Sequence, residues 1–270
     1  MATSRKRPNR NRTASARKRG RGGSFEKRVK QFWKQNKTLI KGGLQFLAIA
    51  LVVFVIAIPF MRVDNPGNTY GIDVSSHNGT VRWDEVSENG VQFAVIRAGA
   101  RTSRTGEIYR DTQFKRNMRR AWFHHVDRGV YFYSQAINEE EAREEAEAVL
   151  KCLSGANLKL PVFYDIEDTG TEGKGRADGL SRAQRTANAL AFAEVIAEEG
   201  YTPGVYANRW YLTSELDADA LRNAGVSIWL AEYTNNERPA YREAYDYWQY
   251  SETGRVPGID GDADLDRVYA

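Results

Sequence analysis

Three carboxylates directly follow an apolar run near the middle of the chain. The segment LPVFYDIEDTG, residues 160–170, is typical of a buried strand, and it carries Asp165, Glu167 and Asp168 at its end. Because burying a charged group is costly, acids at the end of such a strand need an explanation. Successive strand residues point to opposite faces, so Asp165 and Glu167 should point the same way, whereas Asp168 should begin the following loop.

Two further groups of acids occupy comparable places. Asp73 follows the apolar start of YGIDVSS, and the segment GIDGDADLD carries Asp260, Asp262, Asp264 and Asp266. If three strand ends deliver these acids to one mouth, like charges crowd together and the pKa of at least one carboxyl rises. A protonated carboxyl beside ionised ones is suited to general acid catalysis, and cleavage of glycosidic bonds uses such a pair.

Each group of acids also has a structural explanation when it is taken alone. The D-x-E pair could be a helix N-cap and a surface acid. Asp73 could be a turn residue, and the last aspartates could lie in a solvated loop. Their D-x-D-x-D spacing is that of an EF-hand calcium loop, but Leu265 stands where that loop needs glycine. We therefore expect no metal ion here.

Other catalytic chemistries lack their motifs. The three histidines, His77, His124 and His125, form neither H-E-x-x-H nor a zinc-ligand spacing with the single Cys152. No G-x-S-x-G elbow is present, and no P-loop or G-x-G-x-x-G motif follows a strand. The sequence therefore indicates no cofactor. We expect Cys152 to be a core residue of a helix.

Strand-like and helix-like segments alternate over about 200 residues, which predicts an α/β fold with a parallel sheet, most simply a closed TIM-like barrel. The site of such a barrel lies at the C-terminal ends of its strands. Helical patterns weaken late in the chain, so we expect the barrel to be irregular there. The expected strands are 69–76, 91–99, 128–136, 160–168, 202–208, 226–234 and 244–251, and the clearest helices are 138–155, opened by Asn138, and 181–200, opened by Ser181.

The first 62 residues have a different character. Residues 1–42 contain fifteen Lys or Arg and one acid, Glu26, so we expect a disordered tail. Residues 43–62 contain an apolar run of 18 residues interrupted only by Gln45, close to the length that spans a bilayer. The run is longer than the apolar core of a signal peptide, and the segment RVDNPGN that follows it lacks an A-x-A cleavage site, so a retained transmembrane helix is predicted.

The lysine and arginine bias predicts the orientation of this span. Fifteen cations precede it, which indicates a cytoplasmic N-terminus and places the domain of residues 69–270 across the membrane, after a linker of residues 63–68. A nucleic-acid-binding arm is the rival interpretation of the tail. Positive-inside topology and anionic lipids already account for its charge, so no nucleic-acid partner is expected.

Four segments together resemble glycoside hydrolase family 25, the Chalaropsis-type lysozymes or N-acetylmuramidases. They are YGIDVSSHNGTVRW, PVFYDIED, GVYANRWYL and YWQYSETGRVPGIDGDADLD, and the resemblance spans residues 69–270 in the family's motif order. It implies a (βα)5β3 barrel and hydrolysis of the β-1,4 bond between N-acetylmuramic acid and N-acetylglucosamine in peptidoglycan. The basic tail and the predicted span lie outside the resemblance.

The resemblance also implies roles for individual residues. Glu167 corresponds to the family's acid, Asp165 to its partner on the same strand, Asp73 to the first-strand aspartate and Asp264 to the last-strand aspartate. Asp262 and Asp266 offer alternative registers for the last position. Four aromatic residues at or near strand ends are candidates for stacking on sugar rings, with core packing as the alternative for each: Tyr133, Trp229, Tyr233 and Trp248.

Two alternatives stay open at this point. A membrane-tethered protein could keep the fold and bind the cell wall without cleaving it, although the intact acids argue against this. A hydrolase of another polysaccharide would share the same acids.

Overall fold

The computed structural model describes residues 69–169 and 175–268, together with Lys27, Lys30, Gln31 and Lys34. The chain divides into two units, Met1–Val63 and Asp64–Ala270, and the fold described below belongs to the second. The predicted span 43–62 and linker 63–68 lie outside the described residues, as does nearly all of the predicted tail. Within the described part of the chain, no helix is both long and apolar enough to cross a membrane.

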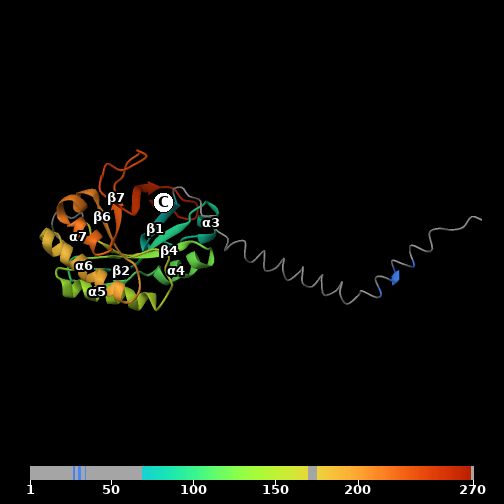
Figure 1. Ribbon diagram of the computed structural model, residues 1–270, viewed down its shortest axis with the longest axis horizontal. Helices are drawn as coiled ribbons and strands as arrows, with labels where there is room; N and C mark the ends of the chain where they lie inside the picture. The colour runs from blue at the N-terminus through green and yellow to red at the C-terminus, as the bar shows by residue number, and fades with distance from the viewer. Residues whose placement is uncertain (1–26, 28–29, 32–33, 35–68, 170–174, 269–270) are drawn as a thin grey trace, which may run out of the picture. The chain divides into compact units, whose positions relative to one another are not determined.

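Eight strands close into a barrel, which confirms the predicted architecture (Figure 1). The strand β1 pairs with β2 on one side and with β9 on the other, and this closes the ring. Neighbouring strands are parallel except for β9, which runs antiparallel to both β8 and β1. The strands are β1 (Thr69–Val74), β2 (Phe93–Arg101), β4 (Asp127–Tyr133), β5 (Val162–Asp165), β6 (Pro203–Asn208), β7 (Ser227–Ala231), β8 (Tyr247–Gly254) and β9 (Ala263–Val268), and the short β3 (Ile108–Arg110) pairs with the end of β2.

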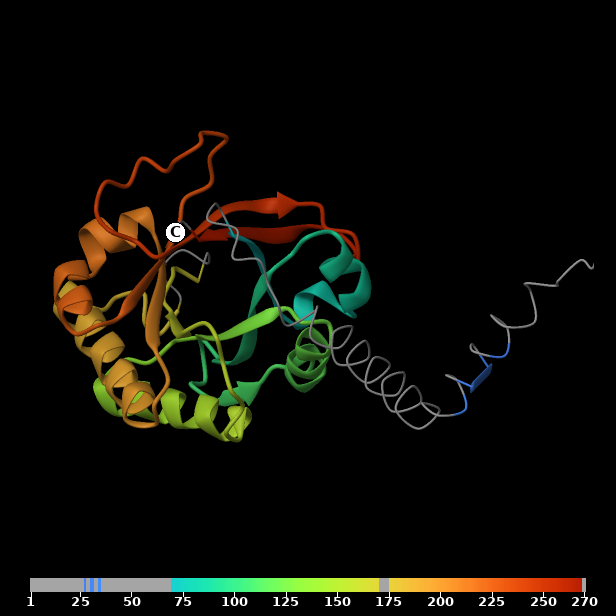
Figure 2. The ribbon, with the colours of Figure 1, turned by 45° about the vertical axis from the view of Figure 1, so that its right-hand side comes forward.

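Helices connect only the first part of the barrel. They are α3 (Trp83–Glu88), α4 (Phe114–Phe123), α5 (Glu139–Leu153), α6 (Arg182–Glu198) and α7 (Ala218–Asn223), with short helical turns at η2 (Ser76–Asn78) and η3 (Tyr211–Glu215). No described helix separates β7 from β8 or β8 from β9, as the weak late helical pattern indicated. Figure 2 shows α3 and α4 together on one side of the barrel and α5, α6 and α7 around the other.

The two clearest predicted helices are present with their predicted first residues. The side chain of Asn138 accepts a hydrogen bond from the backbone N–H of Glu141, and this caps α5. Ser181 caps α6 in the same way through the backbone N–H of Gln184. Such caps satisfy donors that the first turn of a helix leaves unpaired, and they fix where these helices begin.

The interior of the barrel is apolar in the half where the strands begin. Phe163 lies at its centre, with ring centroids 5.0 Å from Trp229 and 5.3 Å from Tyr247. Glycines make room for the rings: a Cβ on Gly71 would lie 2.2 Å from Phe93, and one on Gly204 would lie 2.3 Å from Phe163. This apolar filling closes one end of the barrel, so the inward-facing polar residues collect at the C-terminal ends of the strands.

One strand differs from the sequence analysis. Residues 263–268 were expected only as part of an acidic segment, and they form β9. Asp264 and Asp266 face inward, as does Val268 at the end of the strand, whereas the apolar Ala263 and Leu265 contact the outer core. A strand with acids on its inner face lacks the apolar-inward pattern by which a buried strand is normally identified.

Candidate active site

A cavity of about 170 Å³ opens at the C-terminal ends of the strands. It receives side chains from β1, β4, β6, β7, β8 and β9 and from the end of β5. The residues that line it are Asp73, Tyr131, Asp165, Glu167, Tyr206, Trp229, Tyr233, Gln249 and Asp264. The structure therefore brings together the acids of all three groups that the sequence analysis singled out, although they are up to 191 positions apart in the chain.

The first- and last-strand aspartates face each other across the β1–β9 ladder. Asp73 is the register partner of Asp264, and both Asp73 and Asp266 are buried. Burial and the two neighbouring carboxylates raise the pKa of Asp73 well above its usual range. Burial also raises the pKa of Asp264 to about 6, although a hydrogen bond with Asp73 counteracts this. The closeness of these carboxyls therefore favours a proton shared between Asp73 and the aspartates of β9.

Gln249 of β8 connects this acidic group to two tyrosines. Its Nε2 donates to Oδ2 of Asp73 at 2.7 Å, and its Oε1 accepts hydrogen bonds from the hydroxyls of Tyr206 at 2.7 Å and Tyr233 at 2.9 Å. The amide orientation is fixed by these three contacts, so both tyrosine rings are held at the wall of the cavity. The sequence analysis did not single out Gln249 or Tyr206, although WQYS and GVYAN were among the segments that carried the resemblance.

The D-x-E pair lies on the opposite wall. Asp165 is the last residue of β5 and is only 4% exposed, whereas Glu167 lies two residues further on and is more accessible. Burial, and then the charge of Glu167, raise the pKa of Asp165 well above its usual range. Burial and the nearby Asp264 raise the pKa of Glu167 to about 7. Two buried carboxyls this close keep at least one proton between them at neutral pH.

Arg97 places a buried positive charge near Asp165. This buried arginine of β2 donates from Nε to Asp111 Oδ2 at 2.8 Å and from Nη2 to Ser76 Oγ at 2.9 Å. Its charge lowers the pKa of Asp165, but burial and the charge of Glu167 outweigh it, so that pKa is still raised. Arg97 is thus the contact that favours an anion on Asp165, while the two coupled carboxyls share their protons. The sequence analysis did not single out Arg97; a cation within the apolar run VQFAVIRAG was the available signal.

Asp165 also presents an open acceptor. No described residue donates a hydrogen bond to its buried Oδ1. A buried carboxylate oxygen without a partner is costly, and a donor supplied by a ligand in the cavity would remove that cost.

The four aromatic residues predicted to stack on sugar rings occupy different environments. Tyr233 is 48% exposed at the mouth of the cavity, and Trp229 lines its floor with only 1% exposed. Tyr133 lies near the pair. Burial and the charge of Glu167 therefore raise the pKa of its hydroxyl. Trp248 does not line the cavity. Its neighbour Gln249 points inward, so Trp248 points outward into the core between barrel and helices, where its Nε1 donates to the carbonyl of Glu232 at 2.9 Å.

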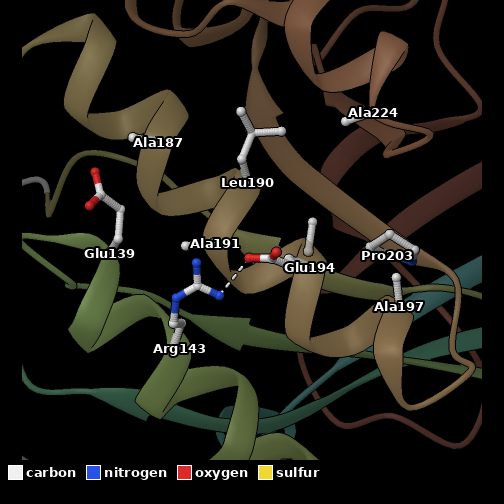
Figure 3. Close-up of a pocket in the computed structure, with 10 residues that line it drawn as sticks. Glu139, Arg143, Ala187, Leu190, Ala191, Glu194, Ala197, Pro203 and Ala224 are labelled. Atoms are coloured by element: carbon white, nitrogen blue, oxygen red, sulfur yellow. Dashed lines mark ion pairs between the residues drawn. The ribbon is translucent and has the colours of Figure 1, made fainter.

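A larger hollow of about 600 Å³ lies elsewhere, on the outer surface of α5 and α6 (Figure 3). Small alanine side chains line much of it, and two of its three charged residues, Arg143 and Glu194, pair with each other at 2.6 Å, the third being Glu139. It lies on the helices, away from the ends of the strands. The smaller cavity is therefore the candidate active site. Among the described residues, no three His, Cys, Asp or Glu are placed to hold a metal ion.

Comparison with known proteins gives a consistent result. The family model for Glycosyl hydrolases family 25 matches residues 72–259. The autolytic lysozyme of Clostridium acetobutylicum is 30% identical over 196 residues, which cover 73% of this chain and 54% of the relative. Lysozyme M1 of Streptomyces globisporus is 28% identical over 219 residues, which cover 77% of this chain and 71% of the relative.

Solved structures share the barrel. The bacterial lysozyme of Streptomyces coelicolor superposes with a TM-score of 0.61 at 26% identity, covering 77% of this chain and 94% of that one. The modular autolysin LytC of Streptococcus pneumoniae, solved in complex with a synthetic peptidoglycan ligand, gives a TM-score of 0.64 at 25% identity and covers 75% of this chain and 47% of that one. The chain thus spans about half the length of LytC and of the clostridial relative.

The buried acids predict that the domain loses stability as the pH rises. Burial raises the pKa of Asp264 to about 6 and that of Glu167 to about 7, and it raises the pKa of Glu145 in the outer core to about 7 as well. The folded state therefore binds more protons than the unfolded chain between about pH 4 and pH 7, and the free energy of unfolding should fall across this range by on the order of a few kcal/mol. Urea unfolding at several pH values measures this slope.

Two carboxyls with lowered pKa values change the stability in the opposite direction, but they do not hide the expected fall in the free energy of unfolding. Hydrogen bonds and arginine partners lower the pKa of Asp111 and Glu141, so their contribution to stability grows until about pH 5.5, above the unfolded pKa values, and is constant from there to pH 7. The matched variant Asp266→Asn removes one buried acid and keeps an acceptor for the indole N–H of Trp229, which lies 2.9 Å from Asp266 Oδ1. Its slope should be shallower. An unchanged slope, or stability that rises from pH 4 to pH 7, would contradict the protonated cluster.

Proposed function

This chain belongs to glycosyl hydrolase family 25, and from that premise we propose that its domain, residues 69–270, is a muramidase. It hydrolyses the β-1,4 bond between N-acetylmuramic acid and N-acetylglucosamine in peptidoglycan. The observation that carries this proposal is the pair Asp165 and Glu167, with burial raising the pKa of Glu167 to about 7 and Arg97 favouring the anion of Asp165. The lysozymes named among the relatives support the choice of substrate.

Glu167 acts as the general acid. It is the more accessible of the two carboxyls, and burial and the nearby charge of Asp264 raise its pKa to about 7, so a large fraction of it is protonated at neutral pH. As the bond between the anomeric carbon and the glycosidic oxygen breaks, the Glu167 proton passes to that oxygen. A water oxygen then bonds to the anomeric carbon, and the proton that water loses returns to the Glu167 carboxylate, so the catalyst is regenerated.

Asp165 stabilises the reacting centre. Its anion lies on the same wall of the cavity as Glu167, where it opposes the positive charge that develops on the sugar ring. Its unpartnered Oδ1 is an acceptor for the N–H of the substrate's 2-acetamido group, and binding that group would orient the sugar. Asp73 and Asp264 complete the acidic wall, and Gln249 fixes Tyr206 and Tyr233 beside it.

The surroundings of the cavity suit a polymer. A second hollow of about 350 Å³ shares Tyr233 with the cavity and continues along the segment after β7 and the β8–β9 hairpin. Tyr250 and Glu252 also line it. Sugars on either side of the cleaved bond need such continuous space, because a glycan strand extends beyond the reacting pair.

We further propose that residues 43–62 anchor the domain in a membrane, with the N-terminus in the cytoplasm and the muramidase outside. The apolar run and the fifteen cations that precede it support this proposal. A tethered muramidase would stay beside its polymer. The acidic character of the remaining chain would limit its adsorption to an anionic wall.

Replacing the acid tests the activity. Glu167→Gln removes the proton donor and keeps the size of the side chain, so we expect turnover of purified peptidoglycan to fall by about 10²–10⁴ or more. Mass spectrometry of the products identifies the broken bond and the new reducing end. The matched control Glu194→Gln changes a carboxylate in the larger outer hollow and should leave turnover unchanged. Wall binding without turnover in the native chain would instead support a silent binding protein.

The pH dependence of the rate tests the protonation state of Glu167. The general acid must be protonated, and the pKa of Glu167 is about 7, so kcat/KM should fall about tenfold per pH unit on the alkaline side of pH 7. The variant Asp264→Asn removes a charge that raises this pKa, so its alkaline midpoint should lie at lower pH. A rate that does not change between pH 7 and pH 9 would rule out Glu167 as the acid.

Membrane extraction tests the anchor. The full chain should stay in the membrane pellet after alkaline carbonate washing. A double substitution, Val52→Arg with Val55→Arg, places two charges in the middle of the span at a cost of about 2.5–3.5 kcal/mol each, and it should release the chain. Antibody against a C-terminal epitope should reach its target on intact spheroplasts, whereas an N-terminal epitope should be protected. Release of the native chain by carbonate would refute the anchor.

A further inference from the structure

The last turns of α4 expose two large aromatic rings next to two arginines. Trp122 and Phe123 are each 63% exposed, more than any other large hydrophobic residue of the described chain. The guanidinium carbon of Arg120 lies 5.7 Å from the centre of the Phe123 ring, and Arg119 is exposed beside them. We call these four residues, Arg119, Arg120, Trp122 and Phe123, the basic–aromatic patch.

The cations of α4 are not neutralised by neighbouring acids. The helix contains Lys115, Arg116, Arg119 and Arg120 and no acidic residue. In the described part of the chain, no carboxylate forms an ion pair with any of the four, and Arg116 donates to the carbonyl of Val81. Exposed arginines beside Trp and Phe are the combination that binds the headgroup region of an anionic bilayer, because phosphates attract the guanidinium groups and the rings enter the interface.

The patch lies at the end of the barrel where the described domain begins. The backbone carbonyl of Tyr70, in β1, accepts from the N–H of Gln92, and the carbonyl of Gln92 accepts from the N–H of Asp127, both at 2.9 Å. The starts of β1, β2 and β4 therefore lie side by side. Asp127 follows the end of α4 by four residues, so the patch is close to the edge at which the chain enters β1. The catalytic cavity lies at the other end of the strands.

The length of the linker restricts how far the end of the barrel that carries the patch can lie from the proposed anchor. Residues 63–68 are six residues, which reach about 20 Å when fully extended. With residues 43–62 in a bilayer, the start of β1 must stay within that distance of the bilayer surface. The end of the barrel that carries the patch is then the end nearest to the membrane.

We propose that the basic–aromatic patch docks on the outer surface of the anionic membrane in which the chain is anchored, and that it holds the catalytic cavity pointing away from the lipid. This inference rests on the proposed membrane anchor and goes beyond it. The anchor fixes only the distance of the domain from the bilayer, whereas the patch fixes its orientation.

Quenching of Trp122 fluorescence tests the docking. The full-length chain is reconstituted in vesicles of brominated phosphatidylcholine with or without brominated phosphatidylglycerol, and the difference between the native chain and Trp122→Phe isolates the signal of Trp122. We expect strong quenching of Trp122 only when phosphatidylglycerol is present, and relief at high salt. Trp210, 57% exposed just after the C-terminal end of β6, is the matched control and should not be quenched by either lipid.

Charge reversal separates docking from anchoring and from catalysis. Arg119→Glu with Arg120→Glu should abolish the quenching of Trp122, while the chain still floats with the vesicles and still cleaves soluble glycan fragments at the native rate. Flotation without quenching of Trp122 in the native chain would refute docking and leave the anchor intact. Failure of the native chain to float would refute both. Concentration-dependent dimers that bury Trp122 without lipid would assign the patch to a second copy and overturn the proposal.

Discussion

The insertion of β9 between β8 and β1 is the constraint on which both the fold and the site depend. Without this antiparallel strand the sheet would remain open, because β1 and β8 do not pair with each other. The same strand places Asp264 opposite Asp73 and buries Asp266 beneath the indole of Trp229. Closing the barrel therefore requires the burial of carboxylates, and that burial raises the pKa values from which the chemistry follows.

The apolar half and the polar half of the barrel interior support each other. Phe163, Trp229 and Tyr247 fill the end where the strands begin, so water is excluded from beneath the acids. Desolvation is the first cause of the raised pKa values of both Asp165 and Glu167, so the catalytic protonation state depends on this packing as much as on the neighbouring charges. Arg97, fixed by Asp111 and Ser76, then makes the two carboxyls unequal.

Periodicity and strand-end acids predicted the barrel, the helices α5 and α6, and the meeting of Asp73, Asp165, Glu167 and Asp264 at one mouth. For the first three acids this follows from local patterns, because a parallel barrel places its strand ends at one face, whereas Asp264 reaches the same face from the start of the antiparallel β9. What the sequence analysis missed depends on pairing between distant segments. The role of Gln249 arises from contacts with Asp73 and Tyr206, which are 176 and 43 positions away. For Trp248 the sequence left stacking and core packing open, because its inward or outward direction depends on the register of β8, which residue type does not reveal.

The position of the cavity relative to the start of β1 limits which glycan the domain can reach. Asp73 lies only four residues after Thr69, about 13 Å along a strand. With the proposed anchor in a bilayer, the extended linker would keep the acids of the cavity within roughly 35 Å of the bilayer surface. With the proposed patch docked as well, the mouth of the barrel would face outward and the reach would be shorter, since the linker would not be extended. A muramidase held in this way would act on glycan strands next to the membrane, which would suit remodelling of the cell's own innermost wall.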